Sequence, residues 1–267
     1  MKNTKPTYSR EHLAYLKKQR NKKILVNVLR VAILVAILGF WELFAQLKVV
    51  DPFITSSPSR VIKTIGSLYS DGSLFYHIGI TLMETIVGFI VAVVVGYLIA
   101  VVLWASDTVR KVLEPYIVVL NSLPKIALGP LIVIWIGTGY DAIIFMTIIV
   151  SVIVCIMNML AGFIAVDKTK LLLMKSMGAS RLTTLRKLII PASLPALMNT
   201  LKVAVGLAWI GSIMGEYVVS KAGLGYLIVY GGQVFKLDLV MTATFILCVL
   251  AGGMYGIIAL IEKKITK

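Results

Sequence analysis

Long apolar runs separated by short polar segments dominate the pattern of this 267-residue chain. A helix needs about 20 mostly apolar residues to cross the hydrocarbon core of a bilayer. Runs of that length predict six spanning helices, at about residues 24–47, 85–105, 116–135, 142–166, 199–215 and 239–261. The pattern therefore predicts an all-α membrane protein with six transmembrane helices.

The second predicted span carries small residues at every fourth position. These residues share one helical face, which lets a neighbouring helix approach closely, and we interpret them as packing residues: Gly88, Ala92, Gly96 and Ala100. The third predicted span contains Pro124 and Pro130 with Lys125 between them, which predicts a broken helix. Before the second span, "SSPSRVIKTIGSLY" predicts a short amphipathic helix on the outer surface, or an ordinary loop helix.

A polar insert, residues 167–195, interrupts the apolar pattern between the fourth and fifth spans. Its spacing predicts a helix from Lys168 to Met177, a bend at Gly178-Ala179, and a second helix with Ser180 as its N-cap.

Four apolar side chains of that second helix are predicted to share a face that can enter a partner's groove: Leu182, Leu185, Leu188 and Ile189. Pro191 and Pro195 are expected to end the helix and to set the beginning of the fifth span. The alternative is a solvated amphipathic loop whose cations contact anionic lipid.

Composition and charge predict how the chain is oriented in the membrane. The chain is 59% hydrophobic and only 15% charged, with a net charge of +15. With six spans both termini lie on one side, and the segments on that side, including the insert, carry 20 of the 27 Lys and Arg residues. Basic residues gather on the cytoplasmic side. We therefore expect cytoplasmic termini, a basic cytoplasmic tail over residues 1–23, a transmembrane domain over 24–267, and a cytoplasmic insert.

The same composition argues against several other classes of function. No basic run is interleaved with aromatic residues, so we expect no nucleic-acid partner. Cys155 and Cys248 lie in apolar runs, and His12 and His77 are too scattered to form a metal site. No nucleophile–histidine–acid or paired-carboxylate constellation is present, and no P-loop motif. We expect neither an enzyme nor a nucleotide site in this chain.

The order of the elements resembles a known family. The sequence is similar to the permease subunit of bacterial ABC importers with the binding-protein-dependent type I transmembrane fold, and within it to the nitrate/sulfonate/taurine branch. The resemblance extends over nearly the whole chain from about residue 40. It is carried by Gly178-Ala179 followed by "SRLTTLRKLIIPASLP", and by "SSPSRV", "LPKIALGPLIVIWIGTG", "DKTKLLLMKSMGAS" and "GEYVVSKAGLGYLI".

The resemblance implies a type I permease core over about residues 74–262 with a coupling insert at 167–195. It implies a separate ABC ATPase that binds ATP, an extracytoplasmic solute-binding protein, and a permease homodimer in the bacterial plasma membrane. This chain itself would need no cofactor. The residues implied to contact the ATPase are Lys175, Ser176, Met177, Gly178, Ala179, Ser180 and Arg181.

One segment departs from the family pattern. The family's Glu-Ala-Ala falls on Leu172, Leu173 and Met174, so the acidic residue is missing. Docking of the ATPase is expected to depend on apolar packing, on Lys175 and on the Gly-Ala bend. The branch suggests a small solute such as a sulfonate, taurine, nitrate or a heterocyclic compound.

Polar residues within the spans are candidates for the translocation pathway: Asn121, Ser122, Lys125, Asn158, Ser212 and Glu216. For Lys125 the alternative is a side chain that reaches the membrane interface. Glu84 and Glu216 lie near the outer ends of their spans, where we expect them to meet water. A secondary transporter or channel working without an ATPase is the alternative function. Its spans usually show internal duplication, which this sequence lacks.

Overall fold

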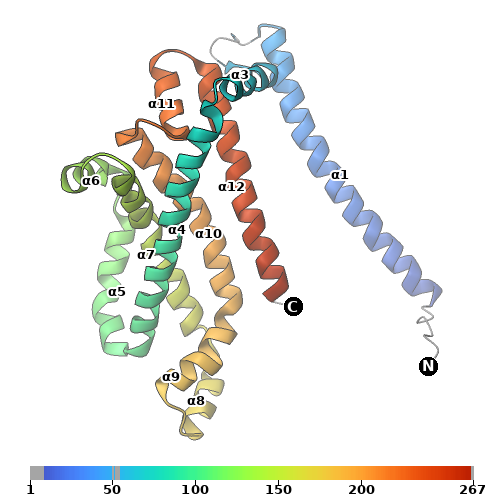
Figure 1. Cartoon of the computed structure of the whole chain (residues 1–267). Coiled ribbons are helices and arrows are strands. Elements are labelled where there is room, and N and C mark those ends of the chain that lie inside the picture. Colours follow the sequence, from blue (N-terminus) through green and yellow to red (C-terminus); the bar gives the residue numbers. More distant parts are fainter. Residues whose placement is uncertain (1–8, 50, 52–54, 266–267) are drawn as a thin grey trace. The chain divides into compact units, whose positions relative to one another are not determined.

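The computed structural model describes residues 9–49, 51 and 55–265. Five of its helices are long and apolar enough to cross a membrane, and a bent pair of helices makes a sixth candidate span. This agrees with the predicted all-α membrane fold. The helices that the text uses are α1 (Arg10–Gln46), α3 (Pro58–Ser70), α4 (Ser73–Ala105), α5 (Asp107–Ser122), α6 (Gly129–Ile136), α7 (Tyr140–Ile164), α8 (Lys168–Ser176), α9 (Arg181–Thr184), α10 (Ile190–Val219), α11 (Leu224–Gln233) and α12 (Leu237–Ile265) (Figure 1).

The chain divides into two compact units, Met1–Lys63 and Thr64–Lys267. In the first unit α1 already begins at Arg10, so much of the predicted polar tail is helical and continuous with the first span. Glu42, near the end of α1, accepts hydrogen bonds from the backbone N–H and the hydroxyl of Ser59, both at 2.9 Å. A carboxylate is favourable there because the first N–H groups of a helix lack intrahelical partners. Glu42 therefore fixes the start of α3.

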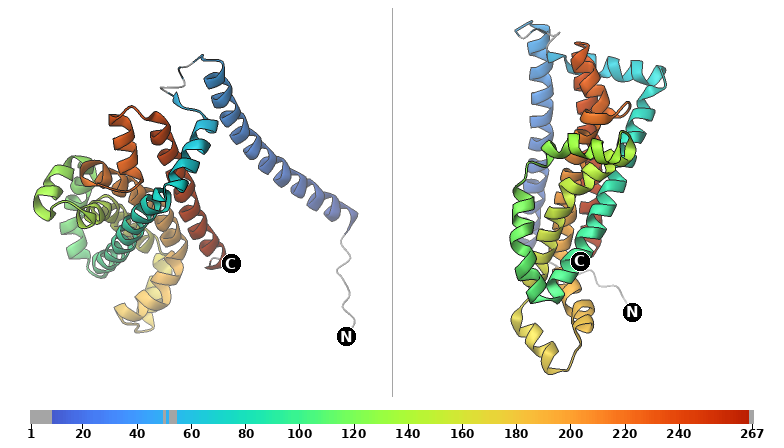
Figure 2. Two further views of the ribbon diagram at one scale, coloured as in Figure 1. Left: turned by 45° about the horizontal axis from the view of Figure 1, so that its top comes forward. Right: turned by 90° about the vertical axis from the view of Figure 1, so that its left-hand side faces the viewer.

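The second unit is built around α7, with α4 and α10 packed against it (Figures 1 and 2). The small residues predicted to pack do face α7: an added Cβ at Gly88 would lie 2.5 Å from Thr147 Cγ2, and one at Gly96 would lie 2.6 Å from Cys155 Cβ. On α10, an added Cβ at Gly211 would lie 2.6 Å from Thr147 Cα. These contacts leave no room for side chains, so glycine sets the distance between the helices.

Two apolar clusters fill the ends of this unit. One joins α4 and α7 to the segment that leads into α10, and its buried members include Leu103, Phe163 and Ile189. The other joins α4, α11 and α12 through Leu74, Leu224 and Leu239, with side chains of α3 against it. Each end of the unit is therefore tied together by a core of its own.

The predicted break in the third span is confirmed. The helix α5 ends at Ser122, and a 3₁₀ turn (Lys125–Leu128) and α6 continue at an angle of 86° to it. Leu123 is extended (φ −66°, ψ 138°). A residue that precedes proline is driven out of the α-helical region, which accounts for the bend directly before Pro124.

The predicted break at Pro191 and Pro195 is wrong. Helical structure runs without interruption from Arg181 to Val219, and Pro195 lies inside α10. A π-helical segment, Leu185–Ile189, comes directly before the prolines. A proline ring clashes with the carbonyl four residues earlier in a regular α-helix, and the wider π turn relieves that clash for Pro191.

We expect Gly211→Ala to lower the stability of the second unit by about 1–3 kcal/mol, because the new methyl group would overlap the backbone of α7. Gly206→Ala, on the same helix, is the matched control, since nothing lies within 4 Å of its added Cβ. It should be neutral or slightly stabilising, since alanine favours helix. Unfolding of both variants in nanodiscs measures the difference, and equal stabilities would contradict this account of α7 packing.

Candidate functional site

The segment from Asp167 to Thr184 forms a protruding elbow, which we call the elbow below. Asp167 Oδ1 accepts from the Thr169 N–H at 2.8 Å and caps α8. Gly178 has φ +70°, a left-handed conformation that glycine adopts without strain, and it reverses the chain. Ser180 Oγ then accepts from the Thr183 N–H at 3.2 Å and caps α9. The predicted helix, bend and cap are therefore confirmed, and Figure 2 shows the elbow projecting from one end of the bundle.

The elbow is rooted in the protein by the apolar face that the sequence pattern assigned to a partner. Leu185 and Ile189 are buried in the core with Phe163, and Leu188 packs against the same cluster. That face is therefore already occupied by the chain's own helices, and only Leu182 remains exposed. The Arg181 guanidinium also donates to the Ala105 carbonyl, the last residue of α4. These contacts couple the elbow to α4, α7 and α10.

A different set of apolar side chains points away from the protein. Leu172, Leu173, Met177 and Leu182 are 64%, 60%, 73% and 55% exposed. Leu172 and Leu173 occupy the positions where the acidic family pattern is missing. Exposed apolar side chains on a protruding polar segment indicate an interaction surface. This set of four side chains is called the elbow surface below.

The other elbow residues implied by the resemblance have local roles. The Ser176 hydroxyl donates to the Leu172 carbonyl of its own helix. Lys175, Ala179 and Arg181 line a cavity of 590 Å³ against the turn that joins α4 and α5. Lys175 is exposed.

Three of the predicted pathway residues meet at the break in the third span. The Lys125 ammonium donates to the backbone carbonyl and to the side-chain oxygen of Asn121, both at 3.3 Å. The Ser122 hydroxyl donates to the Val118 carbonyl at 3.0 Å. Asn121 and Lys125 are half-buried and Ser122 is exposed. The break therefore groups one cation and two polar side chains, and their part in a pathway stays a prediction.

The other three predicted pathway residues lie within the helix bundle. Asn158 is half-buried on α7. The Ser212 and Thr85 hydroxyls share a hydrogen bond of 2.7 Å between α10 and α4. Glu216 is buried, and its Oε2 accepts from the Gly225 and Tyr226 N–H groups at 2.6 and 3.1 Å. The side chains of Ser212 and Glu216 thus bridge helices in this structure.

The expectation that Glu84 and Glu216 meet water is wrong, because the two residues are 0% and 1% exposed. The expectation that the chain has no paired carboxylates is also wrong, because these two carboxyl groups interact between α4 and α10. The two glutamates belong to a cluster of side chains at the N-terminus of α11. The cluster has two further members, Thr81 and His77, which the sequence did not single out. Thr81 Oγ1 accepts from the Leu224 N–H at 2.8 Å, and His77 Nδ1 accepts from the Gly223 N–H at 3.0 Å. A signal was present, since positions 77, 81, 84 and 88 share a face of one helix with the small-residue stripe.

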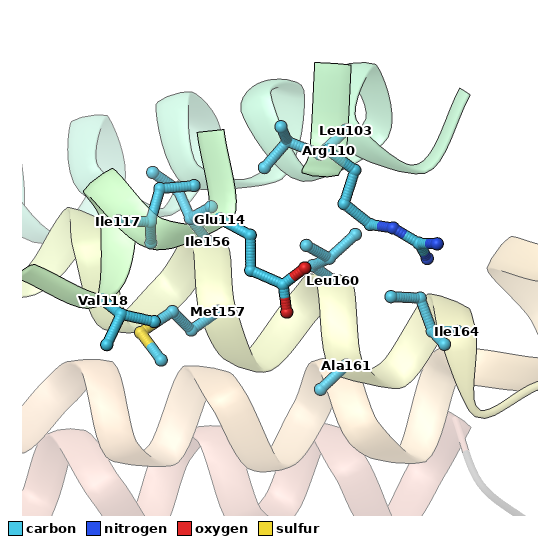
Figure 3. Close-up of a pocket in the computed structure, with 10 residues that line it drawn as sticks. All are labelled: Leu103, Arg110, Glu114, Ile117, Val118, Ile156, Met157, Leu160, Ala161 and Ile164. Atoms are coloured by element: carbon cyan, nitrogen blue, oxygen red, sulfur yellow. The ribbon is translucent and has the colours of Figure 1, made fainter. Parts of the chain in front are cut away.

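A further cavity of 230 Å³ lies between α5 and α7. Figure 3 shows the charged ends of Arg110 and Glu114 over α7, with Leu160 beside the Glu114 carboxyl group and Ala161 beneath it. Arg110 also pairs with Asp107 at 2.8 Å. The cavity is mainly apolar, and its charged groups both come from α5.

Comparison with known proteins identifies the family. Residues 92–267 match the family model described as "Binding-protein-dependent transport system inner membrane component". The chain belongs to this family. Its members are transport subunits and not enzymes, and membership favours the permease interpretation over a secondary transporter or channel. The permease is therefore a multi-pass membrane protein whose family works with an ATPase and a binding protein.

Relatives of the permease cover most of its length. It is 26% identical over 228 residues to the taurine transport system permease protein TauC of Escherichia coli K12, covering 84% of this chain and 83% of the relative. It is 28% identical over 244 residues to the putative aliphatic sulfonates transport permease protein SsuC of the same strain (91% and 92%). A probable ABC transporter permease protein of Haemophilus influenzae is 30% identical over 224 residues (83% and 90%). These relatives agree with the branch indicated by the sequence motifs.

Solved structures share the fold of the permease. An inward-facing MetNI methionine ABC transporter chain matches with a TM-score of 0.67 at 20% identity, over 74% of this chain and 98% of that chain. A chain of a bacterial ABC transporter for alginate matches with a TM-score of 0.64 at 15% identity, over 93% and 100%. At these identities the likeness concerns the fold alone.

We expect Thr81→Val to expose the Leu224 amide to hydrogen exchange, because a buried N–H without an acceptor costs about 1–3 kcal/mol. Thr242→Val is the matched control, since the buried Thr242 hydroxyl donates only within its own helix, to the Asp238 carbonyl. Exchange rates measured by mass spectrometry on peptides that span α11 test this. Unchanged exchange at Leu224 in Thr81→Val would show that Thr81 does not hold the helix.

Proposed function

We propose that this chain is the permease subunit of an ATP-binding-cassette importer, in which it forms the pathway for a small solute. A separate ATPase binds and hydrolyses ATP, and an extracytoplasmic binding protein delivers the solute. Family membership supports this role. The observation that carries it is the elbow, which is rooted in the helix core through Leu185 and Ile189 and presents apolar side chains outward.

The elbow surface is the proposed docking site for the ATPase. Leu172, Leu173 and Met177 offer an apolar patch in place of the acidic residue of the family pattern, and the exposed Lys175 adds a positive charge beside it. Burial of such a patch favours association by roughly 25 cal/mol per Å² of apolar area. The bend at Gly178 presents α8 and α9 together to the ATPase.

The proposed orientation has the elbow and both termini in the cytoplasm of the bacterium, with the permease in its plasma membrane. The distribution of Lys and Arg residues supports it. The functional unit is proposed to be a homodimer. No described residue of α5 is buried, so this helix has a free surface for a second copy.

The proposed solute is a small sulfonate such as taurine, or a related oxyanion. The taurine and aliphatic-sulfonate systems among the relatives support this class. The Lys125 ammonium at the break in the third span supplies a cation that such an anion could meet. Its present partner, the Asn121 side chain, is neutral and is easily exchanged for a charged oxygen.

We expect the double variant Leu173→Asp/Met177→Asp to bind the ATPase at least roughly tenfold more weakly, since it places two charges in an apolar interface. The measurement is recovery of a P-loop ATPase with the purified permease from membranes of its own host. Phe235→Asp is the matched control, because Phe235 is also apolar and 69% exposed but lies in the turn between α11 and α12. Undiminished recovery with the double variant would overturn the docking assignment.

Uptake of radiolabelled taurine or an alkanesulfonate should depend on this gene in host cells and should return on complementation. The Leu173→Asp/Met177→Asp variant should not restore uptake, although it should insert normally. If uptake of these solutes is independent of the gene while the ATPase is still recovered, the solute class is wrong and the role as a permease stands.

A further inference from the structure

The N-terminus of α11 is held by side chains from two other helices. His77 and Thr81 of α4 and Glu216 of α10 accept hydrogen bonds from the first N–H groups of α11. These N–H groups belong to residues 223–226. Glu216 Oε2 takes two of these bonds, and its carboxyl group is packed so closely that a Cβ added at Gly223 would lie 2.2 Å from Oε2. A negative charge at this oxygen is matched by the positive end of the helix dipole.

A second carboxyl group lies against the first without such partners. Glu84 is 0% exposed, and the neighbour of its carboxyl group is the carboxyl of Glu216. Neither oxygen of Glu84 has a hydrogen-bond partner among the described groups, and Glu216 Oε1 has none either. Three carboxyl oxygens are thus buried without a hydrogen-bond partner among the described groups, although the Thr81 hydroxyl also lies close to the Glu216 carboxyl.

No ion pair found among the described residues neutralises either glutamate. The ion pairs Arg110–Asp107 and Lys202–Glu262 of the described residues involve neither glutamate. His77 is a further titratable side chain of the cluster, and its Nδ1 accepts a hydrogen bond from Gly223, so this nitrogen carries no proton. The Tyr217 phenol also interacts with Glu216 and adds no positive charge. Two ionised carboxylates in contact, away from water, would repel each other and would lack donors.

A single proton removes the repulsion between the two carboxylates and gives Glu216 Oε1 a hydrogen-bond donor. Held on Glu84, it lets that carboxyl donate to Glu216 Oε1, while Oε2 keeps its two backbone N–H partners. We propose that Glu84 and Glu216 form a buried proton-binding site, which holds one proton and anchors α11 to α4 and α10. Glu84 is the donor and Glu216 the charged acceptor. The site lies outside the elbow and outside the break at Lys125.

Infrared spectroscopy of the purified full-length chain in nanodiscs at neutral pH tests the proton directly. Wild type should show the carbonyl stretch of a protonated carboxylic acid, and Glu84→Gln should lose it. Glu114→Gln, which alters an exposed glutamate on α5, should keep the band. An identical band in wild type and Glu84→Gln would overturn the proposal.

Thermal unfolding tests the anchoring. Glutamine at position 84 can donate to Glu216 as the protonated acid does, so Glu84→Gln should melt close to wild type, and Glu84→Ala several degrees lower. Wild type should lose stability as pH rises into the alkaline range, because the pair then takes a second negative charge, whereas Glu84→Gln should lose less. A Glu84→Gln protein as unstable as Glu84→Ala would contradict the proposal, as would stability that depends on added sodium in wild type and not in Glu84→Gln.

Discussion

The close approach of α4 and α10 to α7 is the constraint on which the rest of the structure depends. Lipid gives no hydrophobic drive for helices to associate, so packing must come from contact between their surfaces. Here glycine on one helix faces the backbone or the first side-chain atoms of another, at Gly88, Gly96 and Gly211. Any side chain at these positions would separate the helices. The polar groups that link α4 to α10, such as Thr85 and Ser212, come within hydrogen-bonding distance only because of this spacing.

Much of the fold could be predicted because the signals are local. Apolar length, the small-residue stripe from Gly88 to Ala100, the proline at position 124 and the cap at Ser180 each act on their own helix or turn. The wrong predictions concern contacts between side chains of different helices. Helical spacing places Leu185 and Ile189 on one apolar face, but it does not reveal that Phe163 already packs against them. The π turn before Pro191 likewise depends on backbone geometry that residue type alone does not encode.

The candidate functional site was less predictable than the fold, because its residues come together through long-range packing that local sequence signals do not show. The sequence gives Lys125 and the Gly178 bend as unusual features because each differs from its apolar or helical surroundings. His77 and Thr81 are ordinary residues near a helix start, and they acquire their role only when α11 returns to α4 over more than 140 residues of chain. Glu84 is unusual within an apolar run, but its position next to Glu216 depends on the same long-range return.

The elbow and the buried carboxyl pair are joined by one helical segment. From Arg181 to Val219 the chain is helical throughout, a length of 39 residues, which at about 1.5 Å per residue corresponds to roughly 58 Å. At one end Arg181 and Leu185 tie it to α4 and to the core, and at the other Glu216 holds the N-terminus of α11. A partner that displaces the elbow must therefore move α10 as a rod or bend it. The bend would fall at the π segment Leu185–Ile189, where the regular hydrogen-bond ladder is already interrupted. Because Leu185 and Ile189 are themselves buried, the core resists bending there, and motion of the elbow is passed on to α10 and so to α11.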